Sequence, residues 1–177
     1  MADAVGGRSV RCGCRERRRV GRGRGFRRAA FEEPLAERFG DGGLRTTRAR
    51  SLVVMGIGEN GGIAAAAQAD GFIIEPGDVR LRIAACAGRP ACPNAFIDAR
   101  AVAAGLAGHW AGGGLLHVSA CAKGCAAPEG AEVTLVATDE EGRYDLILDG
   151  RAGDVPNHAG LSLNDAMQWM TEKSPTR

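Results

Sequence analysis

Four cysteines between residues 86 and 125 lie in two pairs whose types and spacing suit metal chemistry. Cys86 and Cys92 stand in 84-AACAGRPACPNA-95, and Cys121 and Cys125 stand in 117-HVSACAKGC-125, which gives the spacing C-x5-C-x28-C-x3-C. Thiolates are soft ligands that select zinc or an iron–sulfur cluster. Structural zinc usually takes cysteine pairs separated by about two to four residues. The wider first pair favours a cubane cluster, which tolerates longer spans.

Two other interpretations of the four thiols remain open from the residues alone. They are a pair of disulfides, and a set of buried cysteines that pack as small apolar side chains without a metal. The sequence contains no apolar signal segment and no apolar run long enough to span a membrane, so we expect a cytoplasmic protein with reduced thiols. Cys12 and Cys14 lie in an Arg-rich stretch and are interpreted as incidental.

Charge divides the chain into a basic arm and an acidic body. Residues 1–50 hold 14 Arg and 6 acidic residues, a net charge of +8, whereas residues 51–177 carry a net charge of −6. The arm has few apolar residues to offset the entropy cost of ordering, so residues 1–44 are predicted to be disordered. A nucleic-acid-binding tail is a weaker interpretation than a solvated tail. Residues 45–177 are predicted to form the folded domain.

Short apolar segments around the cysteine pairs predict the elements that position them. In 79-VRLRIAAC-86, apolar and basic residues alternate as in a half-buried strand that runs into Cys86, and 115-LLHVSA-120 predicts a second strand that runs into Cys121. Between them, Pro93 favours a helix start. An apolar stripe predicts the buried face of this helix and comprises Phe96, Ala99, Ala103, Leu106 and Trp110.

Downstream segments complete the predicted sheet. Residues 132–137 and 143–148 favour two strands of a hairpin, and residues 161–173 favour a helix that starts with a capping box of Ser162 and Asp165. The predicted fold is α+β, a small mixed or antiparallel sheet with flanking helices. Because strands that end at one edge of a sheet bring their loops together, we expect the two cysteine pairs to converge.

A glycine-rich segment offers a competing interpretation upstream. Gly56, Gly58 and Gly61 match G-x-G-x-x-G, and Glu75 follows at a distance that suits a dinucleotide fold. Too few residues follow for the crossover helix of a βαβ unit. We therefore disfavour nucleotide binding.

The cysteine segments resemble a known family. The C-x5-C and C-x3-C pairs are similar to the cluster motif of the siroheme-containing nitrite and sulfite reductases, and HVSACAKGC with CAGRPAC looks most like the precorrin-3B synthase branch of that family. The resemblance runs from about Arg45 to about Thr171 and includes EVTLVATDEEGRYDLILDGRAGDVP. It implies a 4Fe-4S domain like that of the nitrite and sulfite reductases. Ala120 departs from the glycine expected before the third cysteine.

The resemblance implies roles for individual residues. Cys86, Cys92, Cys121 and Cys125 match the ligands of the 4Fe-4S cluster, and the cysteine matching Cys125 also bridges the cluster to siroheme iron in the reductases. Arg89 and Lys123, inside the two loops, are candidates for binding the carboxylates of a tetrapyrrole substrate. His117 is expected to lie on the opposite strand face from the neighbours of Ser119 and is interpreted as structural, not as an iron ligand. No catalytic residue is assigned.

The implied activity is that of an oxidoreductase in aerobic cobalamin biosynthesis, which hydroxylates precorrin-3A with oxygen and forms a ring lactone. The cofactors would be the 4Fe-4S cluster and either siroheme or a mononuclear iron, and the electron donor is not specified. The family's enzymes are about twice this length, so we expect a truncated or split form that matches their C-terminal portion, partnered by a chain that supplies the other half. The alternatives are a fragment of a siroheme-dependent nitrite or sulfite reductase and a non-catalytic 4Fe-4S-binding domain. No membrane or nucleic-acid partner is expected.

Overall fold

Apolar segments on either side of residue 78 build separate cores. The computed structural model describes residues 8–11, 33–46, 51–57, 62–70 and 72–172. They divide into two compact units, Met1–Asp78 and Val79–Arg177. The boundary predicted between residues 44 and 45 falls inside a strand of the first unit. No helix within the described ranges is long and apolar enough to cross a bilayer.

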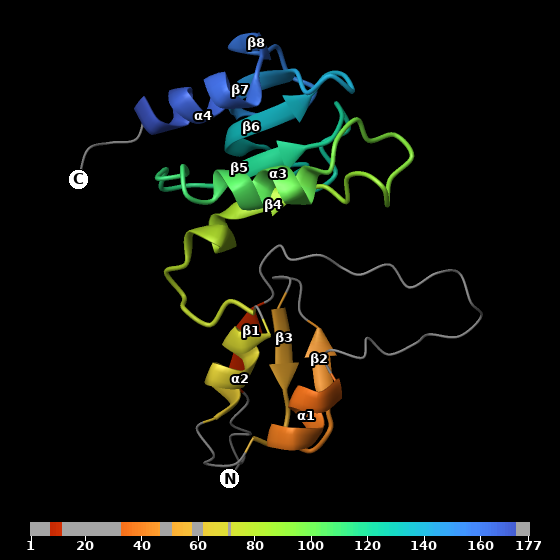
Figure 1. The fold of residues 1–177 in the computed structure, drawn as a ribbon, viewed down its shortest axis with the longest axis vertical. Coiled ribbons are helices and arrows are strands. Elements are labelled where there is room, and N and C mark those ends of the chain that lie inside the picture. Colours follow the sequence, from red (N-terminus) through yellow and green to blue (C-terminus); the bar gives the residue numbers. More distant parts are fainter. Residues whose placement is uncertain (1–7, 12–32, 47–50, 58–61, 71, 173–177) are drawn as a thin grey trace. The chain divides into compact units, whose positions relative to one another are not determined.

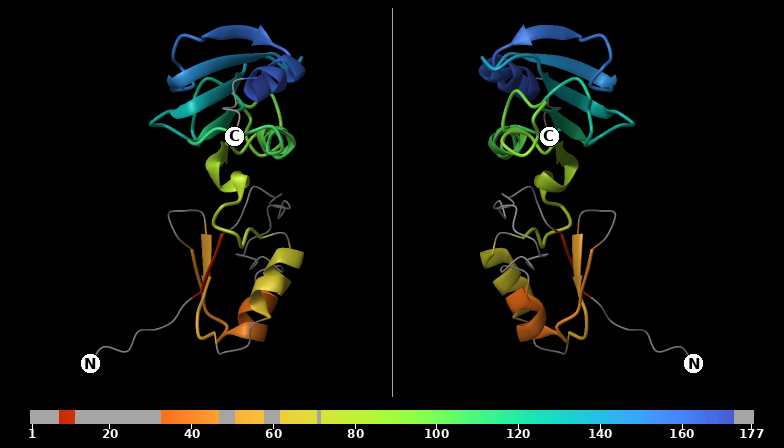
Figure 2. Two further views of the ribbon diagram at one scale, coloured as in Figure 1. Left: turned by 90° about the vertical axis from the view of Figure 1, so that its left-hand side faces the viewer. Right: turned by 90° about the vertical axis from the view of Figure 1, so that its right-hand side faces the viewer.

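The first unit is a three-stranded antiparallel sheet covered on one face by two short helices (Figures 1 and 2). The strands lie in the order β1-β3-β2, and the helices pack through Ala36 and Ile63 against Val54 of the central strand. The elements are β1 (Arg8–Arg11), α1 (Glu33–Phe39), β2 (Leu44–Thr46), β3 (Ser51–Val54) and α2 (Ile63–Ala69).

The structure differs from the predicted disordered arm over residues 33–44. Helix α1 lies here, and its Leu35 and Ala36 are buried, at 8% and 1% exposure. The prediction treated this segment together with the Arg-rich residues before it. The segment EPLAERF alone carries Leu35 and Phe39, which are four residues apart and so lie on one face of a helix. Residues 1–7 and 12–32, which include Cys12 and Cys14, lie outside the described residues.

The glycine-rich segment of the first unit does not lie in a βαβ unit. Strand β3 pairs antiparallel with both β1 and β2, and the helix that follows, α2, has seven residues. Gly58 and Gly61 lie outside the described residues. A dinucleotide site needs a parallel strand before its glycine-rich loop. The antiparallel pairing of β3 therefore agrees with the sequence analysis, which disfavours nucleotide binding.

The second unit is a mixed five-stranded sheet in the order β4-β5-β6-β7-β8 (Figure 1). Strands β4, β5 and β6 run parallel, whereas β6, β7 and β8 pair antiparallel. The α+β fold with a small mixed sheet is therefore confirmed. The elements are η1 (Val79–Arg82), β4 (Ile83–Ala85), α3 (Ala99–Leu106), β5 (Leu116–Ser119), β6 (Ala131–Ala137), β7 (Tyr144–Gly150), β8 (His158–Leu161) and α4 (Leu163–Glu172).

The two faces of this sheet are buried in different ways. Helices α3 and α4 cover one face, where Leu116, Leu135 and Leu146 of neighbouring strands are fully buried (Figure 2). The opposite face carries His117 and Thr134, which are also fully buried. A Cβ placed on Gly124 would meet His117 and Ala152, so loops rather than helices pack on this face.

Several predicted elements were correct and others were not. The hairpin of β6 and β7 is present, and Ser162 and Asp165 exchange capping-box hydrogen bonds at α4. The strand predicted from residue 79 begins as a 3-10 turn and becomes extended only at Ile83. The helix predicted from Pro93 begins at Ala99, where the side chain of Asp98 accepts hydrogen bonds from the backbone of Arg100 and Ala101. Strand β8 was not predicted.

Candidate metal centre

The parallel pairing of β4 and β5 places both cysteine loops at one edge of the sheet. Ala85 pairs with Val118, so the two strands end side by side; Cys86 follows β4 directly, and Cys121 follows β5 after Ala120. The backbone N–H of Cys86 donates to the carbonyl of Val118 at 3.1 Å, and that of Phe96 donates to Ala120 at 3.0 Å. The expected juxtaposition of the two loops is present in the structure.

The four thiols differ in exposure. Cys86 is buried, Cys92 and Cys121 are half-buried, Cys125 is exposed, and all four are free thiols. Among the described residues, no three His, Cys, Asp or Glu side chains form a group that could hold a metal ion. A closed tetrahedral zinc site is therefore not preformed. The donor set, four thiols on two adjoining loops, suits the chemistry of a larger iron–sulfur cluster.

Cys86 lies in a polar, buried environment. Its Sγ is 3.7 Å from Nε2 of His117 and 3.4 Å from Oγ of Ser119. Burial acts to raise the pKa of the Cys86 thiol, but hydrogen bonds from His117, Ser119 and the backbone of Ala120 and Ala126 outweigh it and lower the pKa to about 6. Metal binding requires thiolate, so this environment prepares Cys86 to be a ligand.

His117 and Ser119 lie on one face of β5, as the expected strand alternation requires. They are two residues apart on β5, so their side chains share one face of the strand, and both contact Cys86. His117 was interpreted as structural, and its contact with Cys86 was not predicted. The alternation of residues 117 and 119 on a strand was available from sequence, but the contact with Cys86 requires the pairing register of two distant strands.

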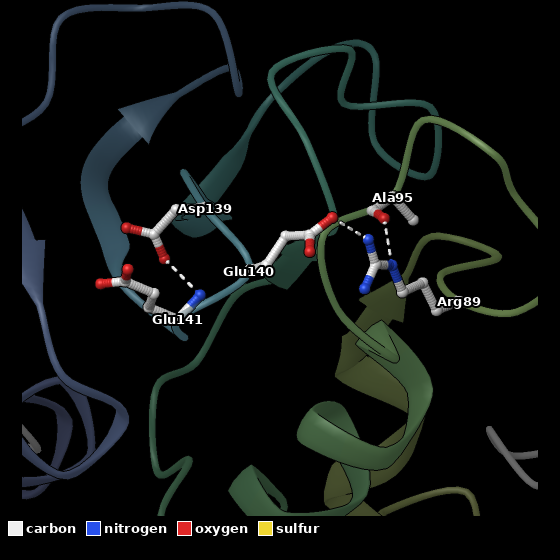
Figure 3. A network of polar contacts seen from close by, with 5 residues as sticks. All are labelled: Arg89, Ala95, Asp139, Glu140 and Glu141. Carbon is white, nitrogen blue, oxygen red and sulfur yellow. Dashed lines mark hydrogen bonds and ion pairs between the residues drawn. The ribbon is translucent and has the colours of Figure 1, made fainter.

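The first cysteine loop is held by arginine side chains. Arg89 donates from Nε to the carbonyl of Ala95 at 2.8 Å and forms an ion pair with Glu140 in the turn between β6 and β7 (Figure 3). Arg100 donates twice to the carbonyl of Ala87, at 3.0 and 2.8 Å. Sequence reasoning missed Arg100 and Glu140. Nothing in the local sequence marks Glu140 as the partner of Arg89, because the two residues lie 51 positions apart.

The two predicted substrate-binding cations, Arg89 and Lys123, therefore differ in how easily an anionic ligand could bind them. Arg89 is already engaged by Glu140 and Ala95, although its side chain remains 46% exposed. Lys123, in the second loop, is exposed. An anionic ligand would have to compete with Glu140 for Arg89 and would meet Lys123 directly.

Glycines shape both cysteine loops. Gly88 has φ of +65° and Gly124 has φ of +60°, in the left-handed region that side chains disfavour. A Cβ on Gly88 would lie 2.5 Å from the backbone nitrogen of Ala99. The loop between Cys86 and Cys92 therefore packs directly on the start of α3. Ala120, expected as glycine, fits because its side chain is buried in the main core of the unit.

Two known proteins are similar to this chain, each over part of its length. The chain is 38% identical over 95 residues to the precorrin-3B synthase of a Sinorhizobium species, a match that covers 51% of this chain and 20% of that protein. The structure resembles the NirA protein of Mycobacterium tuberculosis with a TM-score of 0.60 at 18% identity, over 77% of this chain and 30% of that one. No protein-family model matches.

These matches show a NirA-like fold and sequence similarity to a precorrin-3B synthase. The chain spans about a fifth of the precorrin-3B synthase and under a third of the NirA chain. The matches support the family resemblance of the cysteine segments. They do not identify the reaction of this chain.

We predict that Gly88→Ala destabilises the fold more than Gly142→Ala. Both residues have positive φ, but a Cβ on Gly142 meets nothing within 4 Å, whereas one on Gly88 meets backbone. Gly142→Ala should therefore cost about 1 kcal/mol of strain, and Gly88→Ala should cost at least about 2 kcal/mol, since backbone must also move. Urea unfolding measures both, and equal losses would contradict the close packing of this loop.

We predict that the metal-free protein becomes more stable between about pH 6 and pH 9 because of Cys86. The folded pKa lies below the ordinary value of 9.0, so the unfolded chain binds more protons in this window. The contribution is complete above pH 9 and is lost as the pH falls through 6. Urea unfolding at several pH values should show a smaller slope for Cys86→Ser than for Cys125→Ser, the exposed control. Identical slopes would show that Cys86 is not an ionised thiol.

Proposed function

We propose that the unit Val79–Arg177 is the iron–sulfur module of an oxidoreductase resembling precorrin-3B synthase. A 4Fe-4S cluster would be held by Cys86, Cys92, Cys121 and Cys125. The observation that carries the proposal is the parallel pairing of β4 and β5, which delivers two cysteine loops to one edge of the sheet. The similarity to the Sinorhizobium enzyme supports it independently.

The exposure of the four thiols suggests how the chain would orient the cluster. Cys86 is buried against His117 and Ser119 and would anchor the cluster on the protein side. Cys125 is exposed and would face outward. By its resemblance to the siroheme reductases, Cys125 is the thiol that a second iron, of siroheme or a mononuclear site, would share. When bound, the cluster would supply single electrons to that iron.

The chain's own residues would hold the loops and keep water from the inner side. Arg89 and Arg100 fix the carbonyls of Ala95 and Ala87, so the loop between Cys86 and Cys92 keeps its shape. Ala120 closes the core beneath the third cysteine. A dry inner side and an open outer side match a module that exchanges electrons with a group bound outside it.

For the reaction, we propose the oxygen-dependent hydroxylation of precorrin-3A with lactone formation. The substrate carries many carboxylates, and holding it requires several converging cations. Within the two cysteine loops, the chain offers Arg89, which is paired with Glu140, and Lys123. We therefore propose that further polypeptide supplies most of the substrate-binding cations, as in a partner chain that contributes the other half of the site.

A non-catalytic 4Fe-4S-binding domain is the second candidate. The pairing of Arg89 with Glu140 favours it, because an anionic ligand would have to compete with Glu140 for one of the two loop cations. A fragment of a siroheme-dependent reductase shares the same cluster. The candidates differ in bound groups: a sharp porphyrinoid absorption band requires siroheme, whereas a broad iron–sulfur band alone does not.

We predict that anaerobic reconstitution loads about four iron atoms per chain, as a single cubane requires. Cys86→Ser, Cys92→Ser, Cys121→Ser and Cys125→Ser should each lose most of this iron and the broad visible absorption, since each removes a ligand. Cys12→Ser, in the Arg-rich segment, should keep both. Iron analysis and visible spectroscopy measure the outcome. Equal iron in Cys86→Ser and Cys12→Ser would refute the ligand assignment.

We predict that the reconstituted chain alone does not convert precorrin-3A when oxygen and a reductant are supplied, because too few cations face the site. Adding a chain that carries the part of the Sinorhizobium precorrin-3B synthase outside the matched residues should restore turnover. Mass spectrometry of the product detects the added oxygen. Turnover by the chain alone would show that it, or a homodimer of it, builds the whole substrate site.

A further inference from the structure

A buried polar pair lies beneath the two cysteine loops. His117 and Ser119 project from the same face of β5, and both are 0% exposed. Polar groups buried this deeply usually have partners, because an unpaired one costs about 1–3 kcal/mol. The partner that these two residues share is the Sγ of Cys86.

The hydrogen bonds of Ser119 are already committed. Its hydroxyl donates to the carbonyl of Cys121 at 2.7 Å, and the same oxygen lies 3.4 Å from Cys86. A hydroxyl carries one proton, so Ser119 can donate to the Cys86 sulfur only when it does not donate to the nearer carbonyl of Cys121. Ser119 therefore ties the second cysteine loop to the strand and leaves the Cys86 thiolate in need of another side-chain donor.

His117 is the side chain placed to supply it. Its Nε2 faces Cys86 at 3.7 Å, whereas its Nδ1 is buried and has no hydrogen-bond partner in the described part of the chain. A neutral imidazole has one N–H. Because nothing accepts a proton from Nδ1 and a thiolate accepts one from Nε2, the contacts favour the tautomer with the proton on Nε2.

The imidazole also supports the second cysteine loop. A Cβ built on Gly124, between Cys121 and Cys125, would lie 3.6 Å from Cε1 of His117. The ring is therefore packed beneath one loop while its Nε2 reaches the first cysteine of the other. Ser119 also touches both loops from the interior of the sheet, through the Cys86 sulfur and the carbonyl of Cys121.

We propose that His117 is a positioning residue that donates a hydrogen bond from Nε2 to the Cys86 sulfur and raises the reduction potential of the bound cluster. This inference rests on the proposed cluster. Reduction adds negative charge to the cluster and its thiolates, and a donor at the sulfur stabilises the reduced state more than the oxidised one. The effect is strong here because the pair is shielded from water.

The test is a redox titration of the reconstituted full chain and three variants, followed by visible and electron paramagnetic resonance spectroscopy. His117→Leu removes the donor and keeps an apolar side chain of similar bulk. His117→Gln keeps an N–H donor near the position of Nε2. Thr134→Val is the control, because Thr134 pairs with His117 in register, is equally buried and bonds to the carbonyl of Gly150 rather than to Cys86.

The expected result is a more negative midpoint potential for His117→Leu, with the shift largely restored in His117→Gln and absent in Thr134→Val. Loss of iron in His117→Leu alone would also support the donor. A potential unchanged in His117→Leu, or equal shifts or equal iron loss in the Leu and Gln variants, would overturn it. Failure of the unaltered chain to bind iron would instead refute the proposed cluster and, with it, this inference.

Discussion

The pairing of β4 with β5 is the constraint on which the rest of the second unit depends. The two cysteine pairs are separated by 28 residues, and nothing local relates them. Parallel pairing of Ala85 with Val118 brings them to a common edge, and it also sets Cys86 opposite the polar face of β5. The same pairing aligns Ile83 and Leu116 on the other face, where α3 packs. One register thus fixes both the site and the core.

The loops that carry the cysteines are held by contacts within the protein. Zinc fingers and similar small domains need the metal to fold, since their own core is too small. Here a five-stranded sheet with fully buried Leu116, Leu135 and Leu146 supplies the core, and arginine side chains fix the loop carbonyls. The core of this unit is therefore built by the sheet and its helices.

Sequence patterns predicted the parts of this fold that depend on neighbouring residues. The strand of residues 116–119, the hairpin and the capping box of Ser162 follow from local alternation and spacing, and all are present. The start of β4 was misplaced because V-R-L-R suits a 3-10 turn as well as a strand. Helix α1 was missed because it follows an Arg-rich segment that dominated the composition.

The candidate site likewise has features that local sequence predicted and features that it did not. The four cysteines were recognised from spacing and resemblance, and their roles as ligands remain predictions. The contacts of Cys86 with His117 and of Arg89 with Glu140 were not foreseen, because each joins segments far apart in the chain. Such contacts depend on the register of strands and on the path of loops. Neither property is encoded in a short stretch of sequence.

The path from β5 to β6 gives the second cysteine loop an additional role. These strands are adjacent and parallel, and residues 120–130 alone connect them, without a helix. Parallel neighbours usually need a dozen or more residues to cross over, so this connection is close to the minimum length. A deletion here would break the sheet, and an insertion would let the loop bow away from the face that it covers. Among related chains, length variation should therefore accumulate elsewhere, in surface turns such as the one around Gly142.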